Sequence, residues 1–160
     1  MNRLKLAIVS CGFLGCAPVA PGTFGTLGGV AIAWALSGTE LFGLWALVAA
    51  VLVYAIGQPL GGWSERYAGK KDPGIFVLDE VVGYLVTIAW VTGPSLLALV
   101  TAFFVFRVFD ILKPWPGRRM ERIPGGHGIL LDDVVAGIYG LAVMAAARLV
   151  FPDAPWSLNG

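Results

Sequence analysis

Two pairs of adjacent acidic residues are the strongest candidates for chemistry in this sequence. The pairs are Asp79 with Glu80 and Asp132 with Asp133, and each is followed by an uncharged apolar stretch. An acid pair at the start of a helix can act as an N-cap and complement the helix dipole, which explains many such pairs. If the two pairs lie together, they offer four hard oxygen ligands, which suit Mg²⁺ or Mn²⁺.

A second group of charged residues has the spacing of one helical face. Arg107, Asp110 and Lys113 are three residues apart, so a helix brings their side chains together. They could form an ion-paired helix end whose long side chains reach water. However, four phenylalanines surround Arg107 in the sequence, and an arginine in apolar surroundings is costly without a function. Cations beside a carboxylate suit phosphate transfer, in which the cations stabilise phosphate charge and the acid binds metal or directs water.

A glycine-rich segment, residues 20–29, precedes the first apolar stretch. We expect it to be a loop that leads into a helix, so that its backbone amides and the hydroxyls of Thr23 and Thr26 can bind phosphate. Gly22 and Gly25 belong to the same candidate phosphate loop. The alternative is that these small residues only allow close packing of helices.

The elements that position these side chains must be strongly apolar. Hydrophobic residues make up 58% of the 160 residues and charged residues only 13%, against about 25% charged in soluble domains. High hydrophobicity excludes a disordered chain, and a net charge of +1 argues against a nucleic-acid-binding protein. The composition therefore predicts a membrane protein.

Five apolar stretches predict five helices in a single domain covering residues 1–160. The apolar runs 26–36, 41–56 and 95–106 are shorter than the ~20 residues that a membrane-spanning helix needs. Some helices must therefore begin within loops or enter the membrane without crossing it. We expect the second helix to end at the Gly-Gln-Pro sequence 57–59, and the fifth to run from about Asp133 to Val150. The predicted fold is an all-α, polytopic membrane protein.

The charges lie mainly on one side of this predicted arrangement. Five crossings place residues 1–25, 57–80 and 107–133 on the same side, and these segments hold 10 of the 11 Lys and Arg residues. The positive-inside rule assigns that side to the cytoplasm and the C-terminus to the outside. Because 18 of the 21 charged residues share this face, we expect the polar site to face the cytoplasm.

Four motifs, taken together and in order, resemble the bacterial phosphatidylglycerophosphatase A family over about residues 12–150. They are Pro21-Gly22-Thr23-x-Gly25-Thr26-Leu27, Val77-x-Asp79-Glu80-x-x-Gly83, Phe106-Arg107-x-Phe109-Asp110-x-x-Lys113-Pro114-x-Pro116 and Gly125-Gly126-x-Gly128-Ile129-x-x-Asp132-Asp133-Val134-x-Ala136-Gly137. The resemblance implies a multihelical fold in the bacterial inner membrane. It also implies Mg²⁺-dependent removal of the terminal phosphate of phosphatidylglycerophosphate, which gives phosphatidylglycerol.

The motifs and the resemblance together lead to one mechanistic hypothesis. Asp79, Glu80, Asp132 and Asp133 would hold one or two Mg²⁺, which lower the pKa of an attacking water. Asp110 would complete the ligand set or orient that water. Arg107 and Lys113 would neutralise the phosphate, with further donors from Gly22, Thr23, Gly25 and Thr26.

The sequence leaves several alternatives open. They are water attack or a covalent aspartyl intermediate, the number of metals, selectivity among lipid phosphates, and whether the chain forms a homo-oligomer. A different class of function is a small membrane transporter or channel component, in which acids at helix ends form a cation pathway. We expect no nucleic-acid partner.

Overall fold

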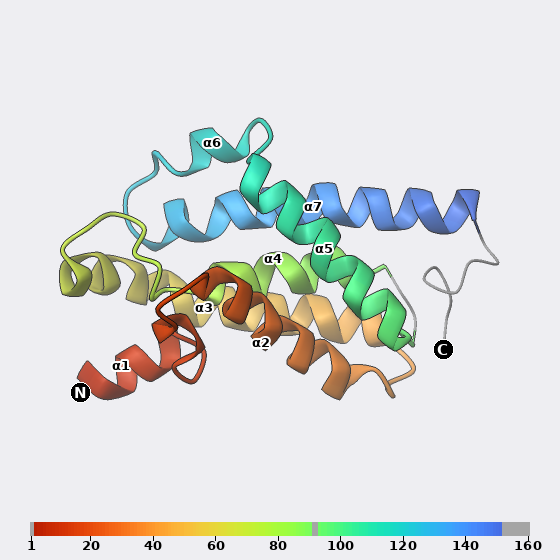
Figure 1. Ribbon diagram of the computed structural model, residues 1–160, viewed down its shortest axis with the longest axis horizontal. Coiled ribbons are helices and arrows are strands. Elements are labelled where there is room, and N and C mark those ends of the chain that lie inside the picture. The colour runs from red at the N-terminus through yellow and green to blue at the C-terminus, as the bar shows by residue number, and fades with distance from the viewer. Residues whose placement is uncertain (1, 91–92, 152–160) are drawn as a thin grey trace.

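The computed structural model describes residues 2–90 and 93–151, and in these residues it contains helices and no strands. The predicted all-α class is therefore confirmed. Figure 1 labels the α-helices along the chain. The elements are α1 (Asn2–Val9), the short 3-10 helix η1 (Leu14–Cys16), α2 (Pro21–Leu36), α3 (Phe42–Ala68), α4 (Leu78–Ile88), α5 (Leu96–Leu112), α6 (Gly117–Met120) and α7 (Gly126–Val150).

Local signals explain several of these helix ends. α2 begins at Pro21, whose fixed φ and missing amide hydrogen suit the first position of a helix. α5 begins after Ser95, whose hydroxyl accepts a hydrogen bond from the Ala98 amide. α3 ends at Ala68 and is followed by Gly69, which has the left-handed conformation typical of a helix C-terminus. These ends are set by residues close in sequence.

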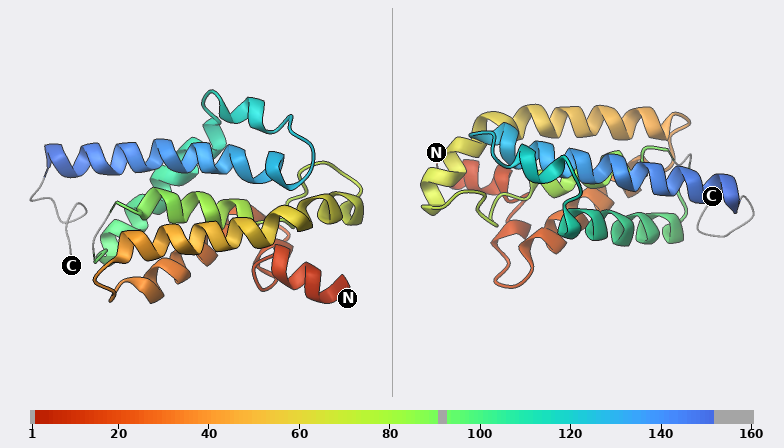
Figure 2. Two further views of the ribbon diagram at one scale, coloured as in Figure 1. Left: turned by 180° about the vertical axis from the view of Figure 1, so that it is seen from behind. Right: turned by 90° about the horizontal axis from the view of Figure 1, so that it is seen from above.

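The short helix α4 is the centre of the molecule and packs against α2, α3, α5 and α7. Seen from above in Figure 2, α3 lies on one side of the α4 and α7 pair, and α2 and α5 lie on the other. Nine of the eleven residues of α4 are buried, although this helix is too short to cross a membrane. α4 is therefore a core element surrounded by the other helices.

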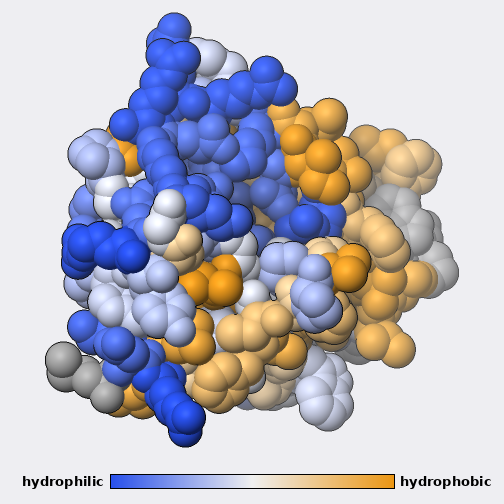
Figure 3. Space-filling model, turned by 60° about the vertical axis from the view of Figure 1, so that its left-hand side comes forward, coloured by the Kyte–Doolittle hydropathy of each residue, from blue (hydrophilic) through white to orange (hydrophobic). Residues whose placement is uncertain are grey.

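Polar and apolar surfaces are separated along the molecule. The space-filling view in Figure 3 shows hydrophilic residues gathered at the end that carries α1, α6 and the end of α3, and hydrophobic residues extending away from it. Large apolar side chains such as Val51, Leu52 and Phe104 are exposed along the helices. Such exposure is expected where lipid, rather than water, surrounds the helices.

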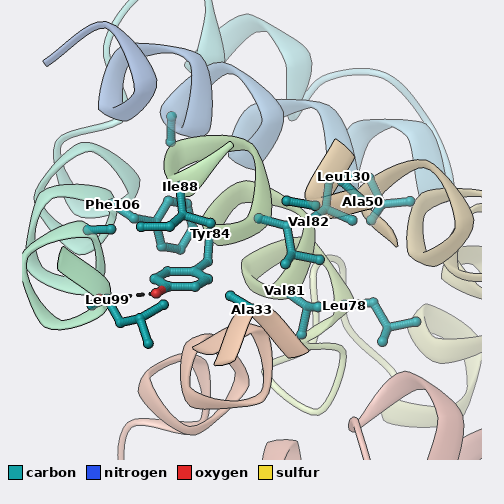
Figure 4. Packing of buried hydrophobic residues seen from close by; sticks show 14 of the residues in the cluster. Ala33, Ala50, Leu78, Val81, Val82, Tyr84, Ile88, Leu99, Phe106 and Leu130 are labelled. Atoms are coloured by element: carbon teal, nitrogen blue, oxygen red, sulfur yellow. Dashed lines mark hydrogen bonds between the residues drawn. The ribbon is translucent and has the colours of Figure 1, made fainter. Parts of the chain in front are cut away.

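The apolar core is built around Tyr84 of α4, which is fully buried. Its hydroxyl donates a hydrogen bond to the Leu99 carbonyl of α5 at 3.0 Å, as Figure 4 shows together with neighbouring side chains such as Ala33 and Phe106. Gly29 of α2 packs against the Tyr84 side chain. One tyrosine thus joins α2, α4 and α5.

Two predicted helix boundaries are wrong. α3 does not end at residues 57–59 but continues through Pro59 to Ala68, because Gly57 and Gly61 serve as contact points rather than helix breakers. A side chain at Gly61 would overlap the backbone of Gly126 in α7. α7 begins at Gly126 rather than near Asp133, so Gly126 and Gly128 belong to its first turn.

Within the described residues, two helices are long and apolar enough to cross a membrane, namely α3 and α7. The structure therefore does not confirm five apolar membrane helices, since α2, α4 and α5 have 16, 11 and 17 residues. Residues 152–160, for which an outside location was predicted, lie beyond the described part of the chain.

Candidate metal and phosphate site

Most of the charged residues identified in the sequence surround one hollow of about 340 Å³. It lies at the polar end of the molecule, between the starts of α2 and α4, the end of α5 and the early part of α7. Its lining residues are Ala20, Pro21, Gly22, Asp72, Gly74, Phe76, Asp79, Glu80, Arg107, Asp110, Ile111, Lys113, Asp132 and Asp133. The fold therefore brings both acid pairs and the Arg107 group into a single site.

Three of the four predicted metal ligands form a compact group. Oxygen atoms of Asp79, Glu80 and Asp133 all lie within 4.8 Å of one another. Asp79 Oδ1 and Glu80 Oε2 are buried and have no hydrogen-bond partner among the described residues. Buried, unpaired carboxylate oxygens are costly unless a cation compensates them. The group therefore fits a divalent cation with hard oxygen ligands.

Helix capping does not explain the two acid pairs. The N-cap position of α4 is Val77, and no side chain caps that end; Asp79 and Glu80 are in the first turn, where they complement the helix dipole. Asp132 and Asp133 lie about two turns inside α7, so the prediction that they open a helix is wrong. Asp133 is only 3% exposed. For the second pair the capping alternative is excluded.

The backbone of two glycines brings the pairs together. A Cβ at Gly137 of α7 would lie 2.5 Å from the carbonyl oxygen of Gly83 in α4, and one at Gly83 would lie 2.7 Å from the carbonyl oxygen of Asp133. Helices approach this closely only where side chains are absent. The spacing of each glycine from its acid pair therefore places Asp133 beside Asp79 and Glu80.

Arg107 forms the cationic side of the site. Its Nη1 lies 2.5 Å from Asp110 Oδ2, one helical turn further along α5. Gly22, at the start of α2, lies against both Glu80 and Arg107, because a Cβ there would overlap Glu80 Oε1 and approach Arg107 Nη1 to 3.1 Å. A phosphate oxygen in this hollow could therefore meet a guanidinium group and the N-terminal end of a helix.

Lys113 is bound to two acids outside the compact group of Asp79, Glu80 and Asp133. It follows the last residue of α5 in a left-handed conformation, and its Nζ lies 2.8 Å from Asp132 Oδ2 and also pairs with Glu121. Burial opposes its charge, but the hydrogen bonds to Asp132 and Glu121 outweigh burial and raise the pKa of Lys113 above its usual range. These hydrogen bonds favour the charged form of the ammonium group beside Asp132.

The predicted glycine loop is not a loop. Helix α2 already begins at Pro21, so Gly22, Thr23, Gly25 and Thr26 are all helical. The buried Thr26 hydroxyl donates to the Gly22 carbonyl at 2.8 Å, and a Cβ at Gly25 would overlap Val77. Of these four residues, only Gly22 lines the hollow. Close packing, the alternative considered for this segment, accounts for Gly25 and Thr26.

Two acids near the hollow were not singled out in the sequence. Asp72 lines it from the loop between α3 and α4, and Glu121 contacts Lys113 from the segment after α6. Both occur among basic residues in runs typical of a solvated surface, Lys70 to Asp72 and Arg118 to Arg122. No local pattern distinguishes them, because their role depends on contacts with distant residues.

His127, which was given no role from the sequence, does not line the hollow. Its Nδ1 is hydrogen-bonded to the Tyr54 hydroxyl at 2.7 Å.

The hollow is lined by more acidic than basic side chains. Six acids line it, and they face two basic groups, Arg107 and Lys113. This excess of acids over basic groups is suited to binding cations.

Comparison with known proteins identifies the family. The family model described as phosphatidylglycerophosphatase A matches residues 7–148. A phosphatidylglycerophosphatase A of Haemophilus influenzae is 36% identical over 152 residues, which is 92% of this chain and 90% of that protein. A phosphatidylglycerophosphatase A of Escherichia coli is 33% identical over 164 residues, covering 99% of this chain and 91% of that protein.

A third relative has a different name. A protein of Bacteroides thetaiotaomicron, provisionally named phosphatidylinositol-3-phosphatase, is 35% identical over 150 residues, covering 89% of this chain and 93% of that protein. No solved structure matches this chain. Since the family model covers most of the chain, and relatives of nearly the same length carry the family's name, this protein belongs to the phosphatidylglycerophosphatase A family.

Proposed function

We propose that this protein is a Mg²⁺-dependent lipid phosphatase that hydrolyses the terminal phosphomonoester of phosphatidylglycerophosphate to phosphatidylglycerol and phosphate. The observation that carries the proposal is the compact trio Asp79, Glu80 and Asp133, in which Asp79 and Glu80 each have a buried unpaired oxygen, beside the Arg107 guanidinium. Family membership supplies the substrate. The rival transporter function has no comparable observation in its favour.

The acid trio is the proposed metal site. Asp79, Glu80 and Asp133 would hold Mg²⁺, with Asp132 at the edge of the same site through its unpaired Oδ1. Oxygen ligands from carboxylates are the usual choice for Mg²⁺. When bound, the metal supplies positive charge that polarises the phosphoryl group and favours attack by water.

The remaining charged residues have separate proposed roles. Arg107 binds the phosphate oxygens, and the amide end of α2 at Gly22 faces the same space. Asp110 holds the guanidinium in place and lies where it can orient a water molecule. Lys113, bound to Asp132 and Glu121, neutralises these acids so that a phosphate dianion is not repelled.

We also propose a multi-pass arrangement in the bacterial inner membrane, with the site facing the cytoplasm. α3 and α7 would cross the bilayer, and the apolar helices α2, α4 and α5 would lie within it, giving five apolar helices in total. The basic residues near the site support the cytoplasmic side. The lipid tails would then stay in the bilayer while the head group reaches the metal.

The test is phosphate release from phosphatidylglycerophosphate in mixed micelles, with Mg²⁺ or with a chelator. We expect Asp79→Asn and Asp133→Asn to lower kcat/KM at least about 100-fold, because the metal contributes several kcal/mol of transition-state stabilisation. Direct Mn²⁺ binding, measured by electron paramagnetic resonance, should weaken in both variants. Glu40→Gln, which removes an exposed acid far along the chain from the site, is the control.

Two results would contradict the proposal. One is full activity of the wild-type protein in the chelator. The other is near-normal turnover by Asp79→Asn at low Mg²⁺. Parallel assays with phosphatidylinositol 3-phosphate compare the two head groups named for the relatives. They measure which of the two lipids this protein hydrolyses with the higher kcat/KM.

A further inference from the structure

The catalytic hollow has one apolar edge that faces away from the protein. Among the described residues that line it, Ile111 is the only large apolar side chain that is exposed, with 72% of its surface accessible. Phe76, the other large apolar residue of the lining, is buried. A lipid whose head group lies in the hollow would therefore have its apolar part next to Ile111.

Ile111 is the last member of an exposed row that runs along the whole of α5. The spacings in this row are three, four, four and three residues, which keep the side chains on one face of a helix. All five residues are large, apolar and exposed: Leu97, Val100, Phe104, Val108 and Ile111. We name this row the α5 stripe. It connects the far end of α5 directly to the catalytic hollow.

The length of the α5 stripe suits acyl chains. From Leu97 to Ile111 the helix advances 14 residues, which is about 21 Å at 1.5 Å per residue. One leaflet of a bilayer has a hydrocarbon depth of about 15 Å. The stripe is thus longer than one leaflet is deep, so an acyl chain that begins at the level of the hollow can contact the stripe along the whole length of the chain.

A second apolar surface, on the side of α3, does not reach the site. A groove of about 250 Å³ is lined by residues of α3, α4 and α7, including Leu47, Val51 and Val134. None of the residues that line this groove lines the catalytic hollow. α3 also lies on the opposite side of the α4 and α7 pair from α5, as Figure 2 shows.

We propose that the α5 stripe is the surface on which the acyl chains of the lipid phosphomonoester bind, so that the substrate enters the hollow sideways from the bilayer past Ile111. The inference rests on the proposed lipid phosphatase activity. It adds that the enzyme selects diacyl substrates through α5, in addition to recognising the phosphate.

The experiment compares two substrates that share one head group. One is phosphatidylglycerophosphate in phosphatidylcholine vesicles, and the other is its deacylated, water-soluble head group, glycerophosphoglycerophosphate. Val108→Asn should lower kcat/KM for the vesicle lipid about tenfold relative to kcat/KM for the soluble head group, because a polar amide replaces an acyl contact. The matched control is Val51→Asn on α3, also an exposed valine, which should leave the ratio of the two kcat/KM values unchanged.

Each outcome bears on a different claim. If the wild-type protein hydrolyses neither substrate, the proposed activity fails. If the wild-type protein hydrolyses the lipid but Val108→Asn leaves the ratio unchanged, or Val51→Asn lowers it equally, the α5 stripe is not the acyl surface.

A second measurement needs no substitution in the stripe. A diacylglycerol phosphonate that carries a diazirine in one acyl chain should crosslink to the 97–111 segment of the wild-type protein. Excess unlabelled phosphonate lipid should suppress this crosslink, and excess phosphatidylcholine should not. Equal suppression by both lipids, or a phosphonate-sensitive crosslink in α3 instead, overturns the proposal even if the valine variants fold poorly.

Discussion

Gly22 places the backbone of α2 directly against two charged side chains of the site. A methyl group there would meet the ends of Glu80 and Arg107, which are flexible, so the side chains rather than the fold must move. We predict that Gly22→Ala lowers kcat/KM at least about tenfold while the melting temperature stays the same or rises, since alanine favours a helix by about 1 kcal/mol over glycine. Both are measured on the purified variant.

Gly62→Ala is the matched control for this change. Gly62 is also helical, and a Cβ there would only touch the flexible Arg66 side chain at 3.5 Å. It should keep full activity. Unchanged kcat/KM in Gly22→Ala would mean that Glu80 and Arg107 tolerate displacement and are not aligned by α2.

Lys113 illustrates how residue type and role can differ. Its place three residues after Asp110 suggested a shared helical face directed at phosphate, but α5 ends one residue earlier. The side chain instead bonds to Asp132 and Glu121. An ammonium group held between two carboxylates neutralises them and does not need a metal to do so.

The contact between α4 and α7 is the element on which the proposed metal site depends. It rests on Gly83 and Gly137, where the two backbones meet without side chains. We predict that Gly137→Ala lowers the free energy of unfolding by roughly 1–3 kcal/mol, because a backbone contact relaxes only by separating the helices. Mn²⁺ affinity should fall in the same variant, since Asp79 and Asp133 are carried by the two helices.

The control for the helix contact is Gly38→Ala, where a Cβ has no atom within 4 Å. It should change neither thermal unfolding nor Mn²⁺ binding. If Gly137→Ala bound Mn²⁺ as tightly as the wild-type protein, the spacing of α4 and α7 would not control the metal site.

Whole-molecule charge asymmetry leads to a prediction about topology. Basic residues are concentrated at the end that carries the site, and Arg148, whose guanidinium donates to the Trp90 carbonyl, is the single Lys or Arg of the sequence outside the segments assigned to that end. We predict that a reporter fused after Val150 reads outside the cytoplasm and one inserted between Lys70 and Lys71 reads inside. Phosphatase and fluorescent-protein fusions together measure both locations.

The topology experiment also tests the number of crossings. Lys70 and Lys71 follow the end of α3, and Val150 ends α7. If both reporters read on the same side, α7 does not cross or a shorter helix turns back within the membrane. A fusion that destabilises the protein would lower both reporter signals. This case is detected by measuring the amount of full-length fusion protein in the membrane fraction.

The sequence by itself determined the chemistry and the class of this protein. Acid pairs at Asp79 and Asp132, the Arg107 group and the apolar composition depend on residue types and short spacings, which are visible without coordinates. The same holds for the all-α class, since helices form from contacts between residues three or four apart. The order of four motifs was enough to indicate the family that the comparisons then identified.

Only the tertiary structure decided which acids act together. Asp133 joins Asp79 and Glu80, whereas its neighbour Asp132 pairs with Lys113. Adjacent residues on a helix point about 100° apart, so the direction in which α7 faces α4 determines which acid joins Asp79 and Glu80. That direction is set by the backbone contact between Gly83 and Gly137. In the same way, α3 continues through Pro59 to the point where Gly61 contacts Gly126 of α7. Contacts between residues more than 50 positions apart have no local signature, because they depend on how whole helices pack.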